Sequence, residues 1–262
     1  MKIPAYHVDA FAGPGFSGNP AMVCPLDRWL DDETLLLIAR KNNLPVTAFF
    51  VADKDHYELR WFTSTMELNL CGHGTLAAAA VVFDSMDASK GFLAFKTKGG
   101  TFKVVQEGSL IGLDFPVLEA TPCSTRPEDL VRALGREPKE ILKAPSQNYL
   151  AVYEGEAEIR AIAPDMELLK EVEGLGVIVT SKGESSDFVS RYFAPRIGIL
   201  EDAATGSTHC TLAPYWSRRF GKRKLHALQL SQRGGELWCE SFDDRIRISA
   251  RALRIAESVL SV

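Results

Sequence analysis

The sequence predicts an α+β fold made of two similar lobes, and two observations lead to this prediction. A polar turn followed by an apolar stretch that can form a helix occurs twice, at residues 63–80 and 201–216. The order of predicted elements around each turn is also the same: strand, helix, strand, strand, turn, helix, strands. Gly72 and Gly206, one in each turn, lie about half the chain length apart, as a single internal repeat requires. We expect each lobe to be a barrel-like, mostly antiparallel sheet around a central helix, with a cleft between the lobes.

The composition is that of an ordinary globular protein. The chain has 262 residues, 46% hydrophobic and 24% charged, which is enough for two medium domains. The net charge of −4 is small and no long basic run occurs, so we expect no nucleic-acid partner. The N-terminus shows no signal-peptide core, and the longest apolar run, residues 76–83, is too short to cross a membrane. We therefore predict a cytoplasmic protein without a membrane partner.

The cysteines exclude two further classes of protein. The chain has five of them, an odd number, and they form no CxxC pair. A disulfide framework is therefore not expected, and reduced thiols are the default. The spacings Cys71-x-His73 and His209-Cys210 offer too few ligands for a four-ligand zinc site, so we predict no metal.

The first predicted hairpin contains a motif that we reject. A strand at residues 3–11 leads into residues 13–18, which match the dinucleotide-binding pattern GxGxxG. That motif needs a helix directly after its last glycine to hold a pyrophosphate. Pro20 and Pro25 follow instead, with apolar residues between them that suggest a second strand. We predict a β-hairpin with Gly18-Asn19-Pro20 as its turn.

The rest of the first half is predicted from caps and periodicity. Acidic residues at 31–33 mark the start of a helix that ends near Asn42 and Asn43. Further elements are strands at 44–51 and 57–63, a buried helix after Gly74, and strands at 92–98, 101–106 and 110–115. Residues 118–127, with two prolines, are predicted to form the crossing between the halves.

The second half is predicted to repeat this plan. Its elements are helices at 128–134 and 165–170, strands at 149–153, 158–162, 177–180 and 188–193, the second turn with its helix, and strands at 225–230, 237–241 and 245–249. We place an N-terminal lobe at residues 1–117 and a C-terminal lobe at residues 118–250. We expect residues 251–262 to return to the N-terminal lobe.

Both turns place chemically active residues at the start of a helix. The first N–H groups of a helix have no partner within it and attract a carboxylate. Cys71 and His73 would bring two proton-transfer groups to the first of these sites, and Asp202 and Ser207 lie at the second. The alternative is structural: a buried thiol at 71, a capping or core imidazole at 73 and a helix-capping carboxylate at 202.

Five short motifs occur in order along the chain: Val8-Asp9-Ala10-Phe11, Gly18-Asn19-Pro20-Ala21, Asn43-Leu44…Thr47-Ala48-Phe49, Cys71-Gly72-His73-Gly74-Thr75 and Glu201-Asp202…Thr205-Gly206-Ser207. Together they resemble the phenazine-biosynthesis PhzF-like family, whose members share the diaminopimelate epimerase-like fold. The resemblance runs from the N-terminus to about Trp216. It implies an isomerase that needs no cofactor, acts on a small anionic, carboxylate-bearing metabolite, and forms a homodimer.

The resemblance also implies roles for individual residues. His73 and Asp202 take the positions of the family's active-site histidine and aspartate, which we predict to form a proton shuttle, and Cys71 takes that of the first thiol of the related epimerases. The backbone or side chains of five residues would bind the substrate: Asn19, Gly72, Gly74, Gly206 and Ser207.

Two positions depart from the pattern. The family's acid–base glutamate corresponds to Val46, which cannot exchange a proton, and the second epimerase thiol corresponds to Thr205. Glu67 could replace the missing base, but we expect it to hydrogen-bond the following turn. Two alternatives therefore remain beside the isomerase: a catalytically silent homologue that binds a metabolite or protein, and a one-thiol epimerase or racemase that uses Cys71.

Overall fold

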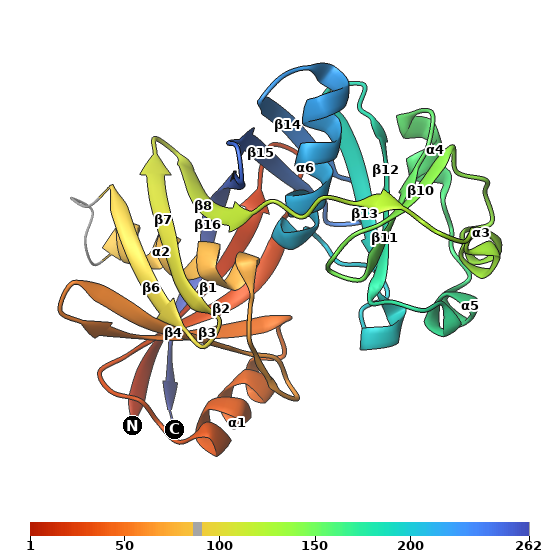
Figure 1. The fold of residues 1–262 in the computed structure, drawn as a ribbon. Helices are drawn as coiled ribbons and strands as arrows, with labels where there is room; N and C mark the ends of the chain where they lie inside the picture. Colours follow the sequence, from red (N-terminus) through yellow and green to blue (C-terminus); the bar gives the residue numbers. More distant parts are fainter. Residues whose placement is uncertain (86–90, 262) are drawn as a thin grey trace. The chain divides into compact units, whose positions relative to one another are not determined.

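The computed structural model describes residues 1–85 and 91–261. The chain divides into two compact units (Figure 1), the first formed by Met1–Asp114 with Ser249–Val262 and the second by Phe115–Ile248. Among the described residues, no helix has both the length and the apolar character that a membrane crossing needs.

In the first unit, eight strands close into a barrel. The order around it is β1-β2-β3-β4-β6-β7-β8-β16, and β16 pairs with β1 to complete the ring. The strands are β1 (Lys2–Ala12), β2 (Asn19–Leu26), β3 (Val46–Asp53), β4 (His56–Phe62), β6 (Phe92–Thr97), β7 (Gly100–Glu107), β8 (Leu110–Pro116) and β16 (Arg245–Ser261). The short β5 (Glu67–Leu68) pairs with β4 outside this ring.

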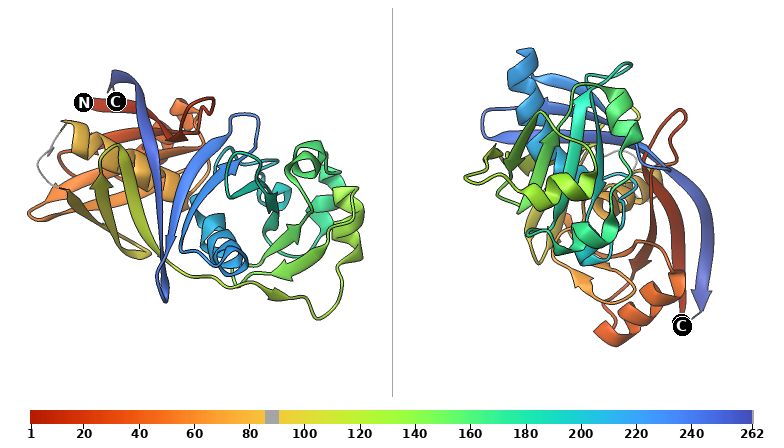
Figure 2. Two further views of the ribbon diagram at one scale, coloured as in Figure 1. Left: turned by 90° about the horizontal axis from the view of Figure 1, so that it is seen from above. Right: turned by 90° about the vertical axis from the view of Figure 1, so that its right-hand side faces the viewer.

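The core of this barrel is the helix α2 (Gly72–Ser85), which lies among the strands (Figures 1 and 2). Residues 74–83 are all buried, and the helix packs on β1, β2 and β3. A helix that is apolar on every side must be covered on every side, which is why this one occupies the middle of the unit. Each large apolar side chain buried there contributes about 1.5–3 kcal/mol. The predicted central helix is confirmed.

The helix α1 (Asp32–Asn42) packs on β3 and β4. The carboxylate of Asp31 caps it by accepting the Thr34 N–H at 2.9 Å, and Asn43 ends it with φ of 51°. Acidic residues occupy the first turn and basic residues the last turn, as the helix dipole favours. Both predicted ends are confirmed.

The second unit is a sheet in the order β16-β15-β14-β13-β12-β11-β10-β9, with the helix α6 (Gly206–Phe220) packed on β14 and β15. Its other strands are β9 (Thr121–Pro122), β10 (Glu140–Lys143), β11 (Asn148–Val152), β12 (Gly176–Lys182), β13 (Phe188–Phe193), β14 (Lys224–Gln229) and β15 (Gly235–Ser241). The helices α3 (Glu128–Leu134), α4 (Glu156–Ala161) and α5 (Met166–Glu171) and the 3₁₀ turn η1 (Pro195–Ile197) complete it.

Strand pairing shows that the two units repeat one connectivity. In the first, β2–β3 is parallel, β3–β4 antiparallel, and β4–β6 parallel with α2 between them in the chain. In the second, β11–β12 is parallel, β12–β13 antiparallel, and β13–β14 parallel with α6 between them in the chain. The predicted α+β class with two pseudo-symmetric lobes is therefore confirmed.

Two predictions of secondary structure are wrong. Residues 158–161 belong to the helix α4, which Ile162 ends, and not to a strand, because the Glu158 carboxylate accepts the N–H groups of Glu154 and Gly155 and caps the helix. The tight turn of the first hairpin is at residues 13–16, where Gly13 and Phe16 exchange backbone hydrogen bonds. Asn19 is the first residue of β2, opposite Ala10, and not part of the turn.

Candidate functional site

The start of α2 brings a thiol and an imidazole together. Cys71 precedes the helix, and its carbonyl accepts both the N–H (3.0 Å) and the hydroxyl (2.7 Å) of Thr75, which closes the first turn. The Cys71 Sγ lies 3.4 Å from Nδ1 of His73. Cys71 is only 6% exposed, whereas His73 is partly buried. The two residues predicted to act at this helix start therefore touch each other.

Gly74 lets this helix start pack closely against β4. A Cβ at this position would lie 2.8 Å from Cδ1 of Trp61 and 3.2 Å from Sγ of Cys71. The Trp61 indole is 1% exposed, so it has little room to retreat. Close packing is therefore sufficient to explain why residue 74 is a glycine. The substrate-binding role of its backbone is a separate prediction.

The start of α6 is organised by hydroxyl, carboxylate and amide groups. Thr205 is the N-cap residue, and its hydroxyl donates to the carboxylate of Asp202. Gly206 is buried as the first helical residue, and Ser207 follows on the exposed surface. Asp202 and Ser207 therefore both lie at the end of α6 where unpaired N–H groups collect.

Gln229, at the end of β14, holds this turn and was not predicted from the sequence. Its Oε1 accepts the Thr205 N–H at 2.8 Å, and its Nε2 donates to the Asp202 carbonyl and the Thr205 hydroxyl, both at 3.0 Å. The side chain is fully buried. A single glutamine at the end of an apolar strand is the only signal that the sequence offers, and it does not reveal the partner.

His209 supports the same turn from within the helix. Its Nδ1 donates to the Thr205 carbonyl at 2.8 Å, and the residue is fully buried. Burial lowers the pKa of His209 to about 4, although the hydrogen bond to Thr205 acts in the opposite direction. The imidazole is therefore neutral near pH 7 and serves as a fixed donor.

An arginine–glutamate pair precedes both helices. Arg60 binds Glu67 with Nε at 2.7 Å and Nη2 at 2.8 Å, and Arg191 binds Glu201 with the same two nitrogens at 2.7 and 3.1 Å. The expectation that Glu67 bonds the following turn is wrong. Its hydrogen bond with Arg60 holds the pKa of Glu67 below its usual range, so this carboxylate is an ion-pair partner and a poor substitute for a catalytic base.

The remaining predicted positions lie in the first unit. Val46 begins β3 and is fully buried, so no proton-transfer group is present there. Asn19 is 1% exposed at the start of β2, and Gly72 is the first residue of α2.

Comparison with known proteins identifies the family of the chain. The family model described as phenazine biosynthesis-like protein matches residues 8–256. The chain belongs to this PhzF-like family. An uncharacterized isomerase of Pseudomonas aeruginosa is 46% identical over 252 residues, with 96% of each chain covered. The human phenazine biosynthesis-like domain-containing protein is 37% identical over 287 residues, with each chain covered fully.

Solved structures confirm the fold of this PhzF-like chain. The crystal structure of a PhzF family protein from Enterococcus faecalis superposes with a TM-score of 0.96 at 39% identity and covers both chains fully. A protein from Agrobacterium radiobacter described as a probable proline racemase, solved with bound carbonate, gives a TM-score of 0.65 at 10% identity, with 99% of this chain and 93% of that chain covered. The similarity to this second structure shows only a shared fold, and that fold is of the diaminopimelate epimerase-like type.

Proposed function

We propose that the protein is a cofactor-independent isomerase that moves a proton on a small carboxylate-bearing metabolite. Membership of the PhzF-like family and the isomerase named among its relatives support this class. The observation that carries the proposal is the placement of titratable side chains at both helix starts, where N–H groups favour an anion.

The proton transfer is assigned to His73 and Asp202. One of the two removes a proton from a carbon of the substrate, and the other returns a proton to a different carbon while the double bond moves between them. The negative charge that develops on the carboxylate-bearing part is stabilised by N–H groups at Gly72–Gly74 and Gly206, with the Ser207 hydroxyl and the Asn19 amide as further donors. Gln229 and His209 act as positioning residues, because they hold the turn that carries Asp202.

Solvent exchange tests this proposal without knowledge of the substrate. Small unsaturated carboxylic acids are incubated with the protein in deuterated water, and deuterium uptake at carbon is measured by mass spectrometry and NMR. We expect uptake with at least one compound, and its loss in His73→Asn and Asp202→Asn. Asp243→Asn, at a side chain that is 93% exposed, is the matched control and keeps the wild-type rate.

A second candidate is a homologue that binds a metabolite or protein without turnover. The buried Val46, at the position that corresponds to a catalytic glutamate in the resemblance, favours it. Calorimetric binding of an acid from the same series without deuterium uptake at any pH supports this candidate and contradicts the isomerase.

A third candidate is an epimerase with Cys71 as its thiol base, favoured by the 3.4 Å contact with His73. Alkylation can test it selectively, because burial raises the pKa of Cys24 and Cys210 to about 12 and that of Cys239 further. A Cys123→Ser background removes the partly exposed thiol. Full deuterium exchange after alkylation of Cys71 rules this candidate out.

The resemblance implies a homodimer, and the sequence itself predicts a location in the cytoplasm. Sedimentation velocity at micromolar concentration measures the assembly directly. A monomer at all concentrations would contradict the dimer.

A further inference from the structure

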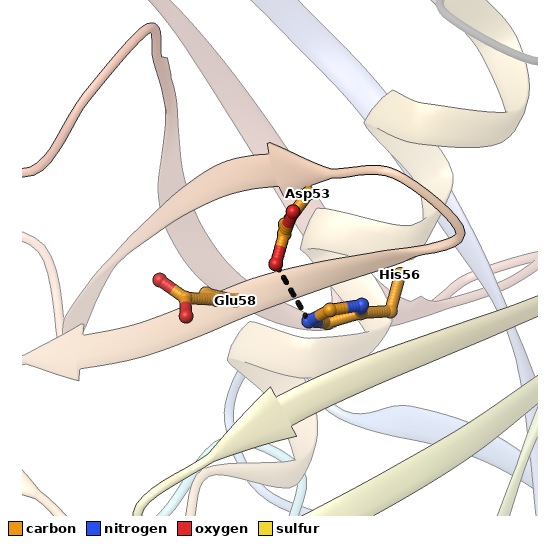
Figure 3. Close-up of side chains that lie close together, drawn as sticks. All are labelled: Asp53, His56 and Glu58. Carbon is orange, nitrogen blue, oxygen red and sulfur yellow. Dashed lines mark ion pairs between the residues drawn. The ribbon is translucent and has the colours of Figure 1, made fainter.

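The β3–β4 hairpin brings three metal-ligating side chains together, and none of them belongs to the proposed active site. Asp53 and His56 face each other across the turn as a cross-strand pair, and Glu58 follows His56 by two residues on the same face of β4 (Figure 3). One ligand atom from each of the three lies within 4.8 Å of the other two. The arrangement follows from strand geometry, so it rests on paired backbone rather than on a loop.

One of the three separations matches that between two ligand atoms of a bound transition-metal ion. Donors about 2.1 Å from a tetrahedral zinc ion lie roughly 3.4 Å from one another. The Asp53 Oδ2 and the His56 Nε2 are 3.5 Å apart, so this edge of a tetrahedron is already formed. The Glu58 carboxylate lies within 4.8 Å of the other two ligand atoms, and a turn of its side chain toward them would complete the set.

A hydrogen bond at Nδ1 of His56 leaves the Nε2 atom available as a metal ligand. His56 Nδ1 lies 3.2 Å from the Asp55 carboxylate, and an N–H at Nδ1 donates to it. In the neutral ring the Nε2 lone pair then points at the Asp53 carboxylate, which is unfavourable unless a cation lies between them. The His56 side chain is 10% exposed, so the surrounding residues limit its alternatives.

Glu58 is oriented by a residue from outside the hairpin. The Trp29 indole N–H donates to Oε2 of Glu58, which leaves Oε1 for another partner. Metal-binding carboxylates are commonly held in this way by a second hydrogen bond. Lys96 lies opposite Glu58 in the β4–β6 pairing, and its charge opposes cation binding.

We propose that this hairpin binds a divalent transition-metal ion of the zinc class through Asp53, His56 and Glu58, with water as the remaining ligand. One imidazole and two carboxylates form a donor set typical of zinc, manganese or cobalt, whereas magnesium and calcium take oxygen ligands alone. The ion ties the two strands together at their turn. The proposal is independent of the isomerase, because it uses no residue of either helix start.

Calorimetric titration of the full chain with zinc chloride, after removal of metals with a chelator, tests the proposal. We expect one zinc ion per chain and an affinity at least tenfold weaker in His56→Ala and in Asp53→Ala. His226→Ala is the matched control, since His226 also lies 2.9 Å from a carboxylate, Glu236, but is outside the three-ligand group. It keeps wild-type binding.

Cobalt(II) distinguishes this site from the thiol at Cys71. Bound at the hairpin, cobalt shows only weak visible bands, without the strong near-ultraviolet absorption of a cobalt–thiolate bond, and these bands disappear in His56→Ala. Circular dichroism confirms that both variants fold. Zinc binding that survives in both variants, thiolate absorption on cobalt binding, or no binding by the wild-type protein would each overturn the proposal. An imidazolium held by Asp53 and Asp55 would then account for the cluster.

Discussion

The starts of α2 and α6 occupy the same position in the repeated connectivity, yet they carry different chemistry. Each begins at a glycine and follows an arginine–glutamate pair, Arg60–Glu67 or Arg191–Glu201. At α2 the groups next to the first turn are a thiol and an imidazole, whereas at α6 they are a hydroxyl and a carboxylate. The repeat therefore keeps the scaffold that shapes the turn and varies the side chains that can exchange protons.

The histidines near the two helix starts show the same division. His73 is partly buried beside Cys71, with its Nδ1 3.4 Å from the Cys71 Sγ, and it is the histidine to which we assign proton transfer. His209 is fully buried in the first turn of α6, and its pKa is lowered to about 4. We therefore propose a chemical role for the histidine of α2, whereas the histidine of α6 serves the structure as a fixed donor.

The largest expected effect on stability tests the network at α6. Gln229→Leu removes three hydrogen bonds and leaves the Thr205 N–H without its partner, so we expect a loss of about 3 kcal/mol from the free energy of unfolding. Denaturant unfolding measures the loss, and hydrogen exchange at the Thr205 amide locates it. Unchanged protection of that amide would show that Gln229 does not hold the turn.

Acid should weaken the α6 turn through His209. The folded-state pKa of about 4 lies below the usual value of about 6.5, so the contribution is complete above pH 6.5 and is lost as the pH falls toward 4. Between pH 7 and pH 5 the free energy of unfolding should decrease by about 2 kcal/mol from this group. His209→Gln removes this part of the pH dependence. An NMR titration that gives His209 a pKa near 6.5 would contradict the account.

At the start of α2, the corresponding test concerns how closely Gly74 packs against its neighbours. Gly74→Ala places a Cβ against the Trp61 indole and the Cys71 thiol, and we expect a loss of about 1–2 kcal/mol even though alanine favours helices. Gly91→Ala is the matched control, because nothing lies within 4 Å of its Cβ. Equal melting temperatures for the two variants would show that the close approach at Gly74 has no cost.

The smallest expected effect on stability concerns the arginine–glutamate pairs that precede both helices. Arg60→Lys and Arg191→Lys each replace a two-nitrogen contact with a single ammonium, which should cost about 1 kcal/mol in each unit. Thermal melts of both variants measure the two costs. Arg191 Nη1 also donates to the carbonyls of Ile159 and Ile162, so we expect the larger of the two costs at Arg191, and a larger cost at Arg60 would contradict the account.

The features that could be predicted from the sequence are those set by residues close together in the chain. The ends of α1 follow from a capping aspartate and a left-handed asparagine, and the repeated connectivity follows from motifs within each half. The strand predicted at residues 158–162 failed because six residues with a good cap form a helix without a long periodic pattern.

Contacts between distant residues of the site were beyond the sequence. The partner of Gln229 is 24 residues away in the chain, and the bond of Glu67 to Arg60 spans the β4–β5 pairing. No residue pattern predicts such pairs. In contrast, Cys71 and His73 are two residues apart at a helix start, and their contact could be expected from the sequence.

We propose that His73 and Asp202 serve one proton transfer, and a double-mutant cycle tests this proposal most directly. Deuterium uptake is measured for the wild type, His73→Asn, Asp202→Asn and the double variant, with the acid that gives the fastest exchange. We predict losses of about 10²–10⁴-fold for each single variant and hardly any further loss in the double variant, because groups of one catalytic unit are not additive. Wild-type exchange in either single variant, or independent losses that multiply in the double variant, would contradict the account.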